Sequence, residues 1–297
     1  MFSPPGAATA RKPRRAGKAR GLLLVPAMTM RVLLLIVPAV AGCIGNVQRA
    51  ARVPHPGVPL GSGQPLEGPA ELSVGLSNVT DMIKPAVGDA SQAVEVPSTE
   101  MRDEVRIRLG RRGQIGLVYE QGFGGTSQQP DRTQAPVGRG DVEGFGVSGG
   151  YSFATDTPGL SIGLVGEMLG WSLPYVEYTT CTSCAPPYTV MSHGRANPVT
   201  LGLGIAPSYR TGAITIFGGV FGRNHPTTQR KELNTDITFN DDGDVQSGPF
   251  NLLVHAGVEL ALAPRLSALV VVHQDVVANP VRYGPGIGVA LTGRLGE

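Results

Sequence analysis

The chain has 297 residues, of which 41% are hydrophobic and only 16% are charged, and 42 are glycine. The length suits one large domain or two ordinary ones, and the charged fraction lies below the roughly 25% that is usual in soluble domains. Seven of the 25 basic residues and none of the 23 acidic ones precede Cys43, so the remainder is net negative and a nucleic-acid-binding function loses its only support.

The amino-terminal segment has the order of a secretory signal. Residues 32–40, VLLLIVPAV, form a short apolar core directly after Arg31, and two small residues follow the core. A core of this length is too short to anchor the chain by spanning a membrane. The sequence therefore predicts a cleaved leader over 1–42. A true start at Met28 or Met30 would give this leader an ordinary length.

The end of the leader resembles a known processing site. Val40-Ala41-Gly42-Cys43 is similar to the lipobox of bacterial lipoproteins, and the resemblance implies that Cys43 is acylated and becomes the mature amino terminus. The residue after it is Ile44 and not aspartate, which in that family implies sorting to the outer membrane. A secreted cysteine behind an ordinary signal is the alternative. Cys181 and Cys184 remain as an even pair and predict a disulfide in an oxidising compartment.

The mature chain divides into a tether and a β domain. Residues 43–70 hold the cysteine and a Pro/Gly-rich stretch that predicts a flexible tether. From residue 71 to 297, apolar residues alternate with small or polar ones, which is the period of β-strands. Ten strands are expected, at about 70–78, 103–110, 113–123, 143–154, 160–171, 198–209, 212–223, 248–262, 266–276 and 284–295.

The connections between these strands alternate between short turns and long polar loops. This layout predicts an antiparallel up-and-down β-barrel of about ten strands, with eight as the alternative, that crosses a membrane with its turns in the periplasm. The pattern resembles the small outer-membrane barrels of the OmpA-like, OmpX-like and omptin families. The chain departs from most of them because it ends in Leu295-Gly296-Glu297 and not in an aromatic residue.

The small and polar face is expected to line a narrow barrel interior. Few lysines or glutamates are available to make this face a soluble exterior, so the apolar face is expected to contact membrane lipid. Scattered ions on the inner face predict an interior polar network formed by Arg106, Arg108, Glu120, His255, Glu259 and Arg294. A catalytic use of His255, Glu259, His273 and Asp275 is the alternative for part of this set.

Three further motifs resemble functional sites in spelling. Gly144, Gly146 and Gly149 match a dinucleotide fingerprint, but they alternate within a strand and do not lead into a helix. Residues 240–244, NDDGD, fail the ligand spacing of a calcium loop and predict a hairpin turn. The segment 181–184 has the CxxC spacing of zinc or redox sites but lacks their context, so no metal or cofactor is predicted.

These observations predict a lipid-anchored outer-membrane barrel that is not an enzyme. Its long loops are expected to serve surface interaction or envelope structure, with an envelope or surface protein as partner. One alternative is a lipid-anchored periplasmic β domain that binds a small ligand, as lipocalins do. The other is a membrane-embedded hydrolase.

Overall fold

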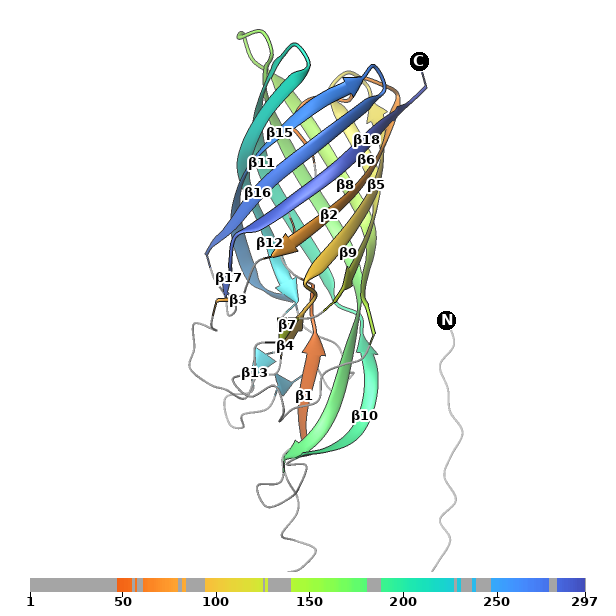
Figure 1. Ribbon diagram of the computed structural model, residues 1–297, viewed down its shortest axis with the longest axis vertical. Coiled ribbons are helices and arrows are strands. Elements are labelled where there is room, and N and C mark those ends of the chain that lie inside the picture. The colour runs from red at the N-terminus through yellow and green to blue at the C-terminus, as the bar shows by residue number, and fades with distance from the viewer. Residues whose placement is uncertain are drawn as a thin grey trace, which may run out of the picture. The chain divides into compact units, whose positions relative to one another are not determined.

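The computed structural model describes residues 47–54, 57, 61–79, 82–83, 94–124, 126–127, 140–180, 188–226, 229–230, 237–238, 247–277 and 282–296. Ten long strands in this part of the chain form a closed barrel (Figure 1). No described helix is long and apolar enough to cross a membrane. The barrel strands are β2 (Ala70–Val79), β5 (Thr99–Leu109), β6 (Gly113–Phe123), β8 (Val142–Ala154), β9 (Leu160–Thr180), β11 (Val199–Thr211), β12 (Ile214–Pro226), β15 (Ser247–Ala263), β16 (Leu266–Val277) and β18 (Gly286–Leu295).

Each barrel strand pairs antiparallel with its neighbours in chain order. The ring closes between the first and last strands, where β18 pairs with β2 from Gly286 opposite Val79 to Leu295 opposite Ala70. Closure leaves none of the ten strands with an unpaired edge. The predicted up-and-down barrel of ten strands is therefore confirmed.

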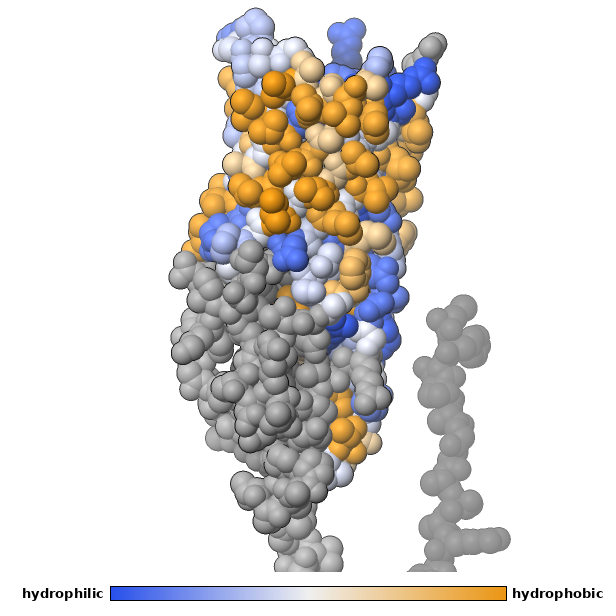
Figure 2. All heavy atoms as spheres, viewed as in Figure 1, coloured by the Kyte–Doolittle hydropathy of each residue, from blue (hydrophilic) through white to orange (hydrophobic). Residues whose placement is uncertain are grey.

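The two faces of the barrel differ in the way that the alternation predicts. Along β11, exposed and buried residues alternate from Val199 to Tyr209, with Leu203 60% exposed and Thr200 fully buried. The same alternation leaves large aliphatic side chains exposed on all ten strands. Figure 2 shows these apolar residues as a broad band over the strands, with hydrophilic residues beyond it. Small, polar and charged residues point inward.

The two ends of the barrel have different connections. At one end, the turn end, pairs of strands are joined by residues 110–112, 155–159, 212–213 and 264–265. Gly110 and Gly212 adopt φ angles of 68° and 59° there, which side chains other than glycine rarely tolerate. Ala70 and Leu295 also lie at the turn end, since Ala70 pairs both with Leu295 and with Ile107, which is close to the turn 110–112. The long connections lie at the opposite end, the loop end.

A second group of strands lies beyond the barrel at the loop end. The prediction ends strand 160–171 at the barrel, but β9 continues to Thr180 and pairs there with β10 (Tyr188–Ala196) on one side and β1 (Val47–Arg52) on the other. These new partners satisfy the backbone groups of β9 after β8 has left it. Shorter pieces complete the set: β3 (Met82–Ile83), β4 (Val94–Val96), β7 (Thr126–Ser127), β13 (Gln229–Arg230), β14 (Ile237–Thr238) and β17 (Arg282–Tyr283).

Candidate functional site: the barrel interior

The interior is lined by inward-facing positions of all ten strands, and β5 contributes more buried charged residues than any other strand. Every second residue of β5, from Glu100 to Arg108, is ionisable. Strand period places all of them on one face. The predicted strand began at residue 103, so the sequence analysis missed the inward positions Glu100 and Arg102.

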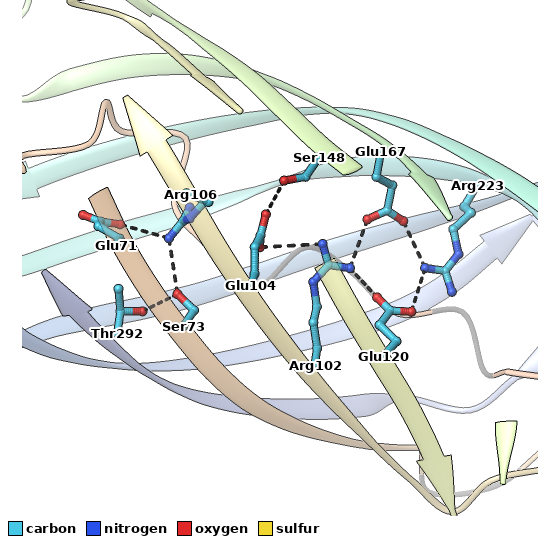
Figure 3. A network of polar contacts seen from close by, with 10 residues as sticks. All are labelled: Glu71, Ser73, Arg102, Glu104, Arg106, Glu120, Ser148, Glu167, Arg223 and Thr292. Atoms are coloured by element: carbon cyan, nitrogen blue, oxygen red, sulfur yellow. Dashed lines mark hydrogen bonds and ion pairs between the residues drawn. The ribbon is translucent and has the colours of Figure 1, made fainter. Parts of the chain in front are cut away.

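Four charged residues form a closed group, here called the charge ring, made of Arg102, Glu120, Glu167 and Arg223 (Figure 3). Nη1 of Arg102 donates to Glu120 and, over 3.0 Å, to Glu167. Nη1 of Arg223 donates to Glu167 over 3.0 Å and to Glu120 over 3.4 Å. Two positive and two negative groups thus neutralise each other in the interior, where an unpaired ion would be costly.

Two neighbours support the charge ring. The guanidinium of Arg223 lies 5.3 Å from the ring centroid of Trp171, within range of a cation–π interaction. The indole of Trp171 donates to the hydroxyl of Thr200 over 2.8 Å. On the other side, Glu104 lies 3.7 Å from Arg102 and accepts a hydrogen bond from Ser148.

A second polar group lies closer to the turn end. Arg106 donates to Glu71 over 3.1 Å, and Ser73 forms a 2.8 Å hydrogen bond with Thr292. Arg294 lies 3.7 Å from the same Glu71 carboxylate. Two of the predicted network residues, Arg106 and Arg294, therefore meet through a glutamate that the prediction did not include.

Residues 61–69, here called the luminal segment, lie inside the barrel among these side chains. Ser62 donates to Glu259 over 3.1 Å, and Gln64 donates to the carbonyls of Gly159 and Ser208. The carbonyl of Gly63 accepts from Ser152 over 2.8 Å. Contacts with strands on opposite sides of a closed barrel place the segment in the lumen.

Glu67 is the main ionic contact of the luminal segment. Its carboxylate pairs with both Arg210 and Arg294, and its backbone carbonyl accepts from Arg108 over 3.4 Å. The predicted residues Arg108 and Arg294 thus hold the segment at the turn end. The stretch predicted as a tether therefore includes residues packed against the barrel wall.

An apolar cluster closes the interior at the loop end. It consists of Ala51, Val53, Val96, Val118, Val142, Leu169, Trp171, Leu173 and Ala196. Ala51 and Val53 come from the chain before the luminal segment and are 0% and 2% exposed. Tyr178 on β9 is buried near this end, and burial raises the pKa of its phenol, so the hydroxyl stays protonated at neutral pH.

The strand pattern alone leaves open whether His273 and Asp275 share the face of His255. In the structure His255 lies directly opposite His273 across β15 and β16, and all three side chains are buried and point inward. Glu259, on the same face, accepts from Ser62 and from Ser267 over 2.8 Å. His255, His273 and Asp275 therefore share one inward face, and Glu259 lies four residues farther along β15, where it is held by two serine hydroxyls.

Two small cavities lie in the described part of the interior. One cavity lies among Ser62, Arg102 and Glu167, and another lies between Ser62 and Arg294. Each has a volume of about 20 Å³, which is room for about one water molecule. Among the described residues, no group of three or more histidines, cysteines or acidic residues is placed to hold a metal ion.

The predicted sites at the cysteines are not described by the structure. Cys43, Cys181 and Cys184 lie outside the described residues, as does the NDDGD segment. The lipidation of Cys43 and the disulfide between the other two therefore stay predictions.

Phe145, Tyr151 and Phe153 are 61%, 44% and 48% exposed on the outer face of β8.

Comparison with known proteins finds no matching family model and no matching curated protein. Solved structures with a similar fold include the translocator domain of the autotransporter NalP from Neisseria meningitidis, with 10% identity, a TM-score of 0.40 and coverage of 90% of this chain and 95% of that one. An outer membrane channel from Pseudomonas putida F1 has 9% identity, a TM-score of 0.42 and coverage of 80% and 99%. LpxR from Salmonella typhimurium has 9% identity, a TM-score of 0.37 and coverage of 76% and 100%. Because these TM-scores are below 0.5, the fold assignment rests on the strand pairing of the chain itself.

Proposed function

We propose that the protein is an integral barrel of the bacterial outer membrane that is also anchored by a lipid on Cys43. The observation that carries this proposal is the exposed apolar band. Leu72, Leu117, Ile205, Val258 and Leu291, on five different strands, are 41–55% exposed on the outer face. A soluble protein rarely exposes so large a contiguous apolar surface. Lipid contact removes the cost of that exposure.

The orientation of the two faces argues against a lipocalin-like periplasmic binder. A barrel of that kind holds its ligand in an apolar interior and presents a charged exterior to water. Here the arrangement is reversed: Arg102 and Glu120 are buried inside, whereas Leu203 and Ile216 are exposed outside. The interior is also occupied by the luminal segment, which contacts Ser152 and Glu259.

We further propose that the protein is not an enzyme and that its loop end serves recognition by a surface or envelope partner. The buried ions neutralise one another: the carboxylates of Glu120 and Glu167 are each held by two arginines. A general base needs a free acceptor within reach of its substrate. The two interior cavities beside Ser62 each have room for about one water molecule and none for a lipid or peptide. Long loops on a rigid barrel suit recognition.

The test is membrane extraction of a Cys43→Ala variant whose leader ends in an ordinary signal-peptidase site, so that export and cleavage continue. Envelopes are washed with alkaline carbonate, and the retained protein is run in detergent with and without heating. We expect the variant to stay in the membrane and to change mobility on heating, as the parent chain does. Recovery of a folded β-protein in the wash would show that the lipid was its only attachment, and membrane insertion would be wrong.

A further inference from the structure

The chain before the luminal segment approaches the barrel from the loop end. β9 runs outward from the turn end, and β1 pairs with its outer part in the antiparallel direction, with Val47 opposite Thr179 and Ala51 opposite Tyr175. β1 therefore runs back toward the barrel. Val47 lies farther from the barrel than Ala51, which is already buried in the apolar cluster at the mouth.

The chain then descends along β5, which runs from the loop end to the turn end. A Cβ placed on Gly57 would lie 3.5 Å from the carboxylate of Glu100, and one placed on Gly61 would lie 2.8 Å from Nη1 of Arg106. Farther along, the carbonyl of Glu67 accepts from Arg108. The described residues Gly57, Gly61 and Glu67 thus lie beside Glu100, Arg106 and Arg108 in turn, from the loop end toward the start of β2.

This path fits the lumen closely and is held at both ends. A Cβ on Gly63 would lie 2.0 Å from the carbonyl oxygen of Ala206, so only glycine fits at this position. Val53 is 2% exposed in the apolar cluster, and Glu67 is held by Arg210 and Arg294. The luminal segment and the described residues before it, here called the threaded chain, are therefore packed into the barrel.

We infer that the mature amino terminus, with the lipid of Cys43, lies on the cell-surface side of the outer membrane. This inference rests on the proposed function and on the predicted orientation of the barrel, with the short turns in the periplasm and the loop end outside. Cys43 precedes Val47 by four residues, which span at most about 14 Å. The start of β1 therefore keeps Cys43 on the side of the long loops.

The test uses three full-length variants, each with one copy of the same epitope. The first has it between Gly45 and Asn46, the second in the loop 128–139, and the third between Arg111 and Arg112 in a short turn. Antibody binding is measured on intact cells and again after the outer membrane is permeabilised. A fourth variant combines the first epitope with Cys43→Ala and the replacement signal-peptidase site.

We expect the first two epitopes to bind antibody on intact cells and the turn epitope to bind only after permeabilisation. The fourth variant is expected to match the first, because the threaded chain and not the lipid sets the side. An amino-terminal epitope that behaves like the turn epitope, while the loop epitope is accessible, would overturn the inference and leave the proposed insertion intact. Protection of the loop epitope as well would overturn both.

Discussion

Replacement of Arg223 by methionine tests the charge ring most directly. Its side chain is 1% exposed and pairs with Glu167 at 3.0 Å and with Glu120 at 3.4 Å. Methionine keeps much of the volume next to Trp171 but leaves two buried carboxylates with Arg102 as their shared partner. Breaking a buried ion pair by removing one partner costs about 3–5 kcal/mol. The equilibrium constant for unfolding should therefore rise about 150- to 5,000-fold.

The assay is unfolding by urea in detergent micelles, followed by the fluorescence of Trp171, which is the single tryptophan of the chain. Because Trp171 is buried against Arg223, its emission reports on this part of the interior. The stability is obtained by linear extrapolation to zero denaturant. A matched control is Arg195→Met, which removes an ion pair with Glu143, whose side chains are 41% and 47% exposed, together with exposed hydrogen bonds to Ser172 and the Asp141 carbonyl. The control should cost about 1 kcal/mol or less.

The double variant Arg223→Met with Glu167→Gln separates charge balance from loss of contacts. It leaves Arg102 paired with Glu120, so the remaining ring is neutral. We expect the double variant to be more stable than the sum of the two single losses predicts, by about 1–3 kcal/mol. Strict additivity, or a loss below about 1 kcal/mol for Arg223→Met, would show that the buried charges do not act as a coupled group.

Three further predictions follow from other parts of the barrel. Leu291→Arg, at the middle outward position of β18, should lower the free energy of unfolding in lipid vesicles by about 2–4 kcal/mol. Leu295→Arg, at the end of the strand, should lower it by about 1 kcal/mol or less. Equal losses of the two variants in urea unfolding would contradict lipid contact. Gly146→Ala should prevent assembly of the heat-modifiable barrel, because its Cβ would lie 1.9 Å from the carbonyl oxygen of Met168, while Gly149→Ala meets only one atom at 3.8 Å and should assemble normally. Removal of the residues before Glu67, with an ordinary signal in their place, should open the lumen, so that this shortened chain conducts ions in planar bilayers while the complete mature chain does not. Equal conductance of the two would show that the threaded chain does not block the lumen.

The alternation of side chains made most of the barrel predictable. In β11 and β15, large apolar residues at every second position specify both the strand and its outer face. The start of β5 was missed because its outward position 103 is an aspartate, so the apolar alternation stops before the strand does. The end of β9 was missed because its last eight residues extend beyond the barrel. There the side chains no longer alternate between the outer and the inner face of the barrel.

The contacts between residues within the site were harder to predict from the sequence. Glu167 and Arg223 lie on β9 and β12, and only the register of the closed barrel brings them to Glu120 on β6. The path of residues 61–69 was not predicted because a Pro/Gly-rich stretch has no period that distinguishes a solvated tether from a chain packed in a lumen. The contacts of Glu67 with arginines more than 140 residues away depend on tertiary structure alone.

The closure of the ring by β18 and β2 also bears on how this protein can be assembled. A chain inside a closed ring of hydrogen-bonded strands must either be pulled through the ring or be enclosed when the ring closes. Pulling the amino terminus through is disfavoured, because even a Cβ on Gly63 would collide with the wall, and the acyl chains proposed for Cys43 would be far larger. We therefore expect the ring to close around a segment that is already in position, with the two ends of the sheet joining where the first and last strands pair. Until then the nascent sheet must stay open, with the inner polar face reachable by the chain that it will enclose.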